Sequence, residues 1–297
     1  MKTVFVIGSG AMGSGIAQNC LTAGYKVILR DISEVQLSKA AQGIEKSLAR
    51  QVSKERMTSA DKDAALARLT TTTSLLQVSE ADMIIEAASE KKDIKKAIFA
   101  EICKLCRQDA ILTTNTSSIS ITEIAGVVSN PSRFIGTHFF NPVPVMKLLE
   151  VVRGLTTSDE TVSIAVAFGK TLGKEIIVSK DNPAFIVNRM LDPMINEAIS
   201  LLEAGIGSVD DIDRGMRFGL NHPMGPLELI DMAGIDIELA VMEVLLAETG
   251  DPKYRPSNLL KNMVRANLLG KKTGKGFYIY HEDGSKEPNP ELLGYLK

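Results

Sequence analysis

The stretch VFVIGSGAMGSGIAQ, residues 4–18, decides how the first part of this chain folds. Its uninterrupted apolar run ends at Gly8, which is typical of a short strand that is buried on both faces. Helical spacing begins directly after the glycines and continues to Gly24, a residue suited to the end of a helix. The order strand, glycine-rich turn and helix predicts the first half of a βαβ unit.

A second apolar run, YKVILRD, follows this helix and ends at Asp31. Further runs with strand character alternate with helical stretches up to about residue 180. They are residues 81–88, 110–118, 133–140 and 174–180. Alternation of this kind predicts an α/β domain with a Rossmann-type doubly wound sheet that carries helices on both faces.

About fifty residues separate Asp31 from the strand at 81, more than one crossover helix needs. They predict a helical-hairpin insertion over about 34–70, with two helices joined near Thr58. Lys46, Arg50 and Lys54 recur at every fourth position and form one basic stripe. The stripe, with Ser47 beside it, could hold a polyanionic ligand or could be a solvated helix face.

The pattern changes at Pro183, where the apolar period switches from two to 3.6. Long helical patterns follow, and no segment with strand character appears before GFYIY at 276–280. We therefore expect two domains, an α/β domain over 1–183 and an all-helical domain over 184–297.

Composition excludes several classes of protein. The 34 basic and 36 acidic residues give a net charge of −2, so nothing favours nucleic acid or an anionic membrane as a partner. No apolar run is long enough for a membrane span or a signal sequence. Three cysteines suit a reducing compartment, and Cys103-x-x-Cys106 fits core packing better than a metal site. We expect a cytoplasmic protein that binds no metal.

The glycine pattern Gly8-x-Gly10-x-x-Gly13 is the signature of a dinucleotide-binding turn when it joins a strand to a helix. The first glycine makes the bend, the second lets a pyrophosphate approach, and the third lets the helix pack closely on the strand. Free N–H groups at the helix start, near Ala11 and Met12, would face the phosphates.

Asp31, at the end of the second predicted strand, would accept hydrogen bonds from the adenosine ribose of the dinucleotide. Its negative charge would repel a 2′-phosphate, which favours NAD, although the neighbouring Arg30 leaves NADP open. The alternative is a plain βα turn in a flavodoxin-like or sugar-nucleotide domain.

The segment THFFNPVPVMKLLEVV contains a candidate catalytic pair. His138 lies at the carboxyl end of a predicted strand, where open α/β sheets bind their ligands. Imidazole can remove the hydroxyl proton during hydride transfer near neutral pH, and Glu150 could orient the ring. Each residue taken alone also has a simpler interpretation. His138 could have only a structural role, and Asn141-Pro142 could be only a turn.

Taken together, the motifs of this chain resemble those of the 3-hydroxyacyl-CoA dehydrogenase family. The resemblance extends over nearly the whole chain, and the motifs occur in the family's order. They are GSGAMGSGIA, TTNTSSISITEIA, HFFNPVPVMKLLEVV, NPAFIVNRML, NHPMGPLELID and GKKTGKGFYIY.

The resemblance implies hydride transfer between NAD(H) and an acyl-CoA, interconverting an (S)-3-hydroxyacyl-CoA and a 3-oxoacyl-CoA, with short acyl chains. It assigns His138 as the base, Glu150 as its partner and Asn141 as an active-site residue. Ser117 and Asn188 match residues that bond the substrate oxygen, and Ser117 is also placed beside the cofactor. Further cofactor contacts would be Glu90, Lys95, Asn115 and Lys272. Contacts to CoA would be Ser47 and Lys54.

The resemblance also implies a homodimer formed through the helical domain, which would close over the acyl chain. Two alternatives stay open on the residues alone. One is a dinucleotide-binding protein without catalysis on the same scaffold. The other is a related hydroxyacid or sugar-nucleotide dehydrogenase that does not use CoA.

Overall fold

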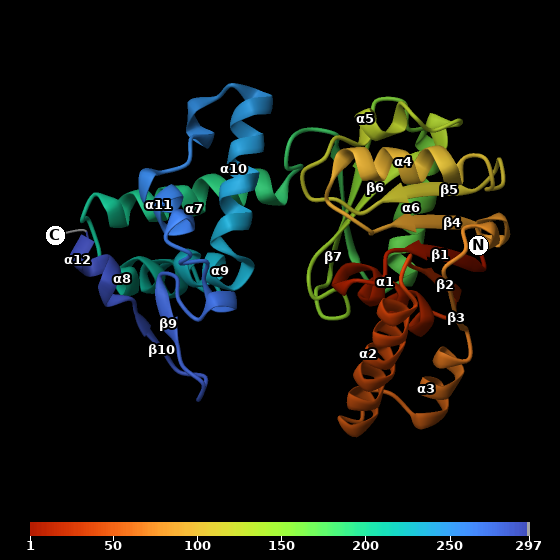
Figure 1. Ribbon diagram of the computed structural model, residues 1–297, viewed down its shortest axis with the longest axis horizontal. Helices are drawn as coiled ribbons and strands as arrows, with labels where there is room; N and C mark the ends of the chain where they lie inside the picture. Colours follow the sequence, from red (N-terminus) through yellow and green to blue (C-terminus); the bar gives the residue numbers. More distant parts are fainter. Residues whose placement is uncertain (296–297) are drawn as a thin grey trace. The chain divides into compact units, whose positions relative to one another are not determined.

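The computed structural model describes residues 1–295 and divides between Asn182 and Pro183 into two units (Figure 1). The first unit is built on an eight-stranded sheet with the order β3-β2-β1-β4-β5-β6-β7-β8. The strands are β1 Thr3–Ile7, β2 Lys26–Arg30, β3 Leu69–Thr72, β4 Met83–Glu86, β5 Ile111–Thr114, β6 Phe134–Phe139, β7 Leu148–Arg153 and β8 Glu175–Lys180.

Strands β3 to β6 are parallel, β7 returns antiparallel to β6, and β8 is parallel to β7. The expected Rossmann-type sheet is confirmed, with two strands that the sequence pattern did not predict. Strand β3 reads LTTT, too short and too polar to be recognised. Strand β7 makes the sheet mixed, because its link to β6 is a loop of only eight residues, too short for the crossover that a parallel strand needs.

Helices cover both faces of the sheet. They are α1 Ala11–Thr22, α2 Glu34–Ser53, α3 Ser59–Leu66, α4 Lys92–Ile102, α5 Ile121–Ala125 and α6 Asp159–Thr171, with short 3₁₀ turns at Leu76–Glu80 and Pro131–Arg133. Side chains alternate along a strand, so Val4 and Val6 of β1 face one layer and Phe5 faces the other. The Phe99 ring of α4 meets the Phe134 ring of β6 edge-on, with centroids 4.9 Å apart.

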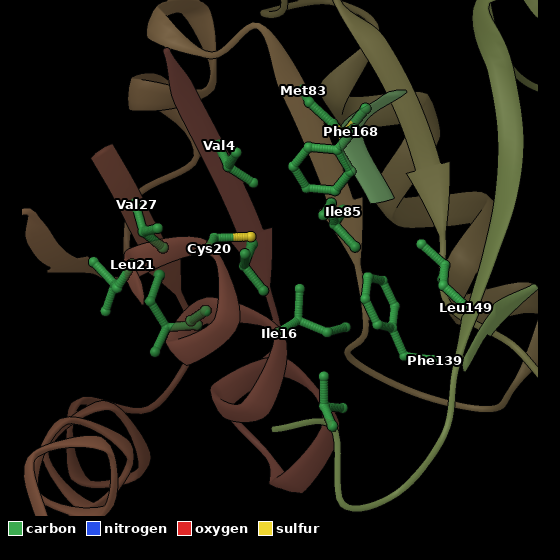
Figure 2. Close-up of a cluster of buried hydrophobic side chains, with 14 of the residues drawn as sticks. Val4, Ile16, Cys20, Leu21, Val27, Met83, Ile85, Phe139, Leu149 and Phe168 are labelled. Carbon is green, nitrogen blue, oxygen red and sulfur yellow. The ribbon is translucent and has the colours of Figure 1, made fainter. Parts of the chain in front are cut away.

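Figure 2 shows the cluster on the α1 face, where Val4, Ile85 and Leu149 of the sheet meet Ile16 and Phe168 of the helices. The cluster also includes Cys20, which is fully buried, and this burial raises the pKa of its thiol. Apolar contacts of this kind fix α1 on the sheet and, with it, the glycine turn that precedes the helix.

The predicted helical-hairpin insertion is present as α2 and α3. Thr58 is the N-cap of α3, and its Oγ1 accepts a hydrogen bond from the backbone N–H of Asp61. On α2, Leu37, Ile44 and Leu48 are buried, which leaves the basic stripe on the exposed side.

The second unit is helical, as the pattern predicted. It contains α7 Val187–Glu203, α8 Val209–Arg214, a π-helical turn Gly215–Gly219, α9 Pro226–Ala233, α10 Ile235–Thr249, α11 Asn258–Arg265 and α12 Pro290–Tyr295. Two 3₁₀ turns, Pro252–Tyr254 and Lys271–Thr273, connect them. One correction to an all-helical domain is a small hairpin of β9 Tyr278–Tyr280 and β10 Lys286–Pro288.

Candidate active site

The glycine turn between β1 and α1 has a steric requirement at two of its three glycines. Gly8 has φ +95°, which L side chains rarely adopt, and a Cβ there would lie 2.5 Å from the Cα of Ala88. A Cβ on Gly13 would lie 1.8 Å from the carbonyl oxygen of Gly8. Packing within the chain therefore demands glycine at both positions.

Gly10 differs, because a Cβ there would meet no described atom within 4 Å. Gly10 is the N-cap of α1, directly before Ala11 and Met12 in the first turn. Because glycine has no side chain, the N–H groups of this turn are not capped by one. Open space in front of uncapped backbone N–H groups is what a pyrophosphate needs for a close approach. The turn thus fits a dinucleotide by both shape and hydrogen-bonding character.

Asp31 lies directly after β2 and contacts the same turn. Its Oδ2 accepts hydrogen bonds from the backbone N–H and the hydroxyl of Ser9, each at 2.8 Å, and its Oδ1 accepts one from Ser33 N–H. Burial acts to raise the pKa of Asp31, but these hydrogen bonds outweigh it and the pKa is lowered. The residue is therefore an anion held against the glycine turn.

His138 and Glu150 are brought together by the antiparallel pairing of β6 with β7, in which they lie directly opposite each other. His138 Nδ1 is 3.0 Å from Glu150 Oε2. Both side chains are buried, Glu150 completely. A proton on Nδ1, held by the carboxylate, places the lone pair of the neutral ring on Nε2. The arrangement can take a proton at Nε2 and stabilise the resulting cation.

Glu90 connects the loop after β4 to the NTSS segment, residues 115–118, that follows β5. Its Oε1 accepts hydrogen bonds from Thr116 Oγ1 at 2.6 Å, from Ser117 N–H at 2.9 Å and from Ser117 Oγ at 3.1 Å. Glu90 and Ser117, predicted as cofactor and substrate contacts, are thus direct neighbours at the carboxyl edge of the sheet.

A buried ion pair between Glu86 and Lys95 is the principal feature that the sequence analysis missed. Both side chains are fully buried, and Lys95 Nζ lies 2.7 Å from Glu86 Oε2. Lys95 also donates to the carbonyl oxygen of Asn115 at 2.8 Å and lies 3.8 Å from Glu90 Oε2. The available signal was an acidic residue that ends an apolar strand, MIIE.

The Glu86 carboxylate accepts hydrogen bonds from three segments at the carboxyl edge of the sheet. Its Oε1 accepts the N–H of Ala88, the residue against which Gly8 packs, and its Oε2 accepts the hydroxyl of Thr114 as well as Lys95. One carboxylate therefore fixes the backbone beside the glycine turn, the end of β5 and the buried lysine.

Asn115 extends this network to the catalytic strand, because its Oδ1 accepts the backbone N–H of Phe139 at 3.0 Å. Phe139 directly follows His138. Asn141 is exposed two residues further on and is joined to Pro142 by a cis peptide bond.

The predicted CoA contacts lie on α2, away from its buried side. Lys54 is exposed at the end of the helix, and Ser47 is half-buried. The two remaining predicted contacts belong to the second unit. Asn188 lies in the first turn of α7, and Lys272 lies in a 3₁₀ turn, where it forms an ion pair with Asp236.

Within residues 1–295 there is no cluster of three or more His, Cys, Asp or Glu side chains that could hold a metal ion. None of the helices in this range is both long and apolar enough to cross a membrane.

Each of the two units matches the model of a known protein family. Residues 3–182 match the 3-hydroxyacyl-CoA dehydrogenase, NAD binding domain, and residues 185–280 match the 3-hydroxyacyl-CoA dehydrogenase, C-terminal domain. The resemblance drawn from the motifs is therefore confirmed, and with it the expectation of NAD as the cofactor.

Similar proteins span the same length. The chain is 48% identical to the 3-hydroxybutyryl-CoA dehydrogenase of Bradyrhizobium diazoefficiens over 94% of this chain and 96% of that one. It is 45% identical to the 3-hydroxybutyryl-CoA dehydrogenase of Clostridioides difficile, over 93% and 99%. The crystal structure of (S)-3-hydroxybutyryl-CoA dehydrogenase from Ralstonia eutropha matches with a TM-score of 0.93 and 50% identity, over 95% and 100%. The chain belongs to the 3-hydroxyacyl-CoA dehydrogenase family.

Proposed function

We propose that the protein interconverts (S)-3-hydroxybutyryl-CoA and acetoacetyl-CoA by NAD-linked hydride transfer, with His138 as the general base. The observation that carries the proposal is the 3.0 Å contact between His138 and Glu150 on adjacent strands of the sheet. A protein that only binds a dinucleotide has no need of an oriented imidazole at this position, which argues against the non-catalytic alternative.

In the oxidative direction, His138 Nε2 removes the hydroxyl proton of the substrate. When bound, the nicotinamide of NAD supplies the hydride acceptor. Glu150 stabilises the imidazolium that forms and keeps the ring in one orientation. In the reductive direction the same nitrogen returns the proton to the oxygen.

Ser117 and Asn188 are proposed to hold the substrate oxygen, and Asn141 to line the site. The Ser117 hydroxyl donates to Glu90 in the structure. To donate to a substrate oxygen it must rotate away from Glu90, while its backbone N–H keeps the segment in place. We infer that Glu90 holds the Ser117 hydroxyl in one orientation by this hydrogen bond when no substrate is bound. Cofactor contacts are proposed for Gly8, Gly10, Ala11, Met12, Gly13, Asp31, Glu90, Lys95, Asn115, Ser117 and Lys272.

The CoA moiety is proposed to lie along α2. Ser47 supplies a hydroxyl and Lys54 a cation for its phosphates. Lys54→Glu should raise the KM for acetoacetyl-CoA and leave NADH affinity unchanged, which separates this function from that of a dehydrogenase acting on a substrate without CoA.

The proposal includes a homodimer formed through the second unit and a reducing, cytoplasmic location. Large apolar side chains of this unit are well exposed, among them Met190, Ile206 and Phe218. All three cysteines are unpaired, as a reducing compartment favours. Light scattering after size-exclusion chromatography measures the mass, which should be twice that of one chain.

The proposed reaction is tested by following NADH and NADPH oxidation at 340 nm with acetoacetyl-CoA. Rapid oxidation of NADH, and slower oxidation of NADPH, is expected because the Asp31 anion repels a 2′-phosphate. If neither cofactor is oxidised, acetoacetyl-CoA is not a substrate and the proposed reaction is wrong.

A further inference from the structure

A buried lysine lies in the turn between α6 and β8. Lys174 is only 8% exposed, and its ammonium group donates to two backbone carbonyl oxygens, that of Val143 at 2.5 Å and that of Met146 at 2.7 Å. Burial lowers the pKa of this ammonium group, and no carboxylate within residues 1–295 forms an ion pair with it that would oppose the shift. A buried cation without a counter-ion is costly, so its two carbonyl contacts need an explanation.

Both carbonyl groups belong to the loop of residues 140–147. This loop joins β6 to β7, so it links the strand of His138 directly to the strand of Glu150. It also contains Asn141, which is proposed to line the site. The Asn141 side chain is exposed and forms no hydrogen bond with another residue of the described part of the chain. The path of the loop backbone therefore sets the position of this side chain.

Lys174 completes the hydrogen bonding of the loop. The carbonyl oxygen of Pro142 accepts the N–H groups of Val145 and Met146, at 2.9 and 3.0 Å, and these bonds close one tight turn. Among residues 1–295, no backbone N–H donates to the carbonyl oxygens of Val143 and Met146, and the ammonium group donates to both. One cation thus satisfies two carbonyl groups that would otherwise be unpaired.

The same loop packs on α1. A Cβ on Gly15 would lie 2.9 Å from Val143 Cβ and 3.4 Å from Pro144 Cδ, so the loop lies close against this helix. Val143 is completely buried there. The loop is therefore held at two places, by apolar contact with the helix that follows the glycine turn and by the ammonium group of Lys174.

We propose that Lys174 is a positioning residue for the reaction, because it holds the 140–147 loop and, through this loop, places Asn141 in the active site. This inference rests on the proposed function. Lys174→Met keeps most of the side-chain volume but leaves two carbonyl groups of the loop unpaired, so the loop should shift to pair them with water. Because a displacement of about 1 Å can cost about 10²-fold in rate, kcat should fall about ten- to hundredfold.

The test measures kcat and KM for Lys174→Met with acetoacetyl-CoA and NADH. The fall in kcat should come with a change of less than about twofold in the KM for NADH, because no proposed cofactor contact is lost. Lys170→Met, exposed in the last turn of α6, is the matched control and should leave kcat unchanged. If Lys174→Met does not fold, Lys174→Gln, which keeps a donor for one of the carbonyl groups, takes its place.

A double-mutant cycle with Asn141→Ala separates positioning from general destabilisation. If Lys174 acts through Asn141, Lys174→Met should lower kcat by less than about twofold further in the Asn141→Ala background. An effect as large in that background as in the wild-type protein would overturn the inference. So would a kcat of Lys174→Met equal to that of Lys170→Met.

Hydrogen exchange tests the loop without turnover. The amides of Val145 and Met146 should exchange about ten- to hundredfold faster in Lys174→Met than in Lys170→Met, which corresponds to the loss of one hydrogen bond from a charged donor. Equal exchange in the two variants would also overturn the inference. Failure of the proposed function is a different result, because the wild-type protein would then not oxidise NADH with acetoacetyl-CoA while the difference in exchange would persist.

Discussion

Replacing Glu86 by glutamine should destabilise the first unit far more than its small change in shape suggests. Glu86 Oε2 accepts two donors, Lys95 Nζ and Thr114 Oγ1, and Oε1 accepts a third, the N–H of Ala88. A glutamine amide group would face a donor in either orientation. Because Glu86 and Lys95 are both fully buried, the loss of the Glu86 charge leaves the lysine with only the half-exposed Glu90, 3.8 Å away, as a counter-charge, at a cost of up to about 3–5 kcal/mol.

The substitution should lower both the free energy of unfolding of the first unit and the affinity of the protein for NADH. Hydrogen exchange of the β4 and β5 amides reports the stability of this unit. NADH fluorescence reports the affinity for NADH, which should fall because Ala88 and Thr114, whose groups donate to the Glu86 carboxylate, are held less firmly. Glu86→Gln combined with Lys95→Met removes the unpaired charge and should recover part of the loss.

Glu80→Gln is the matched control for these variants. Glu80 pairs with Lys26 at 3.1 Å, but both side chains are about half exposed, so the loss should stay below about 1 kcal/mol. Equal losses of stability in Glu86→Gln and Glu80→Gln, or a double variant no more stable than Glu86→Gln alone, would show that burial of the ion pair does not set its contribution.

Two further predictions concern the glycine turn and the helical unit. Gly10→Ala should leave thermal stability within about 1 kcal/mol and weaken NADH binding, whereas Gly13→Ala should unfold the first unit because its Cβ collides with Gly8; calorimetry measures both. Burial raises the pKa of Asp192 to about 7, so this residue alone should remove up to about 4 kcal/mol of stability between pH 4 and 7, in addition to the losses from Asp231 and Glu238, whose pKa values burial also raises. Asp192→Asn should make the loss of stability with rising pH smaller in thermal unfolding, and profiles parallel to that of the wild-type protein would contradict the assignment.

Local features of the fold were predictable because their causes lie close together in the sequence. The glycine turn joins a strand to a helix within a few residues, and steric contacts at Gly8 and Gly13 explain why those glycines are there. The caps and the joint of the α2–α3 hairpin near Thr58 are equally local. Strand β10 was missed because KEP, with its proline, has little strand character.

Features that depend on pairing across the sheet were harder to predict. Sequence separation alone does not place His138 opposite Glu150; the antiparallel return of β7 does. The pair of Glu86 and Lys95 likewise forms only when α4 packs against the end of β4. The motifs indicated that Lys95 matters, but its complete burial comes from tertiary structure.

The most direct test of the catalytic claim is the rate of NADH oxidation by His138→Gln with acetoacetyl-CoA, measured beside the dissociation constant of NADH. Removal of a positioned general base costs about 10²–10⁴ in rate. We predict a fall of this size with NADH binding unchanged. Turnover close to that of the wild-type protein would contradict the account.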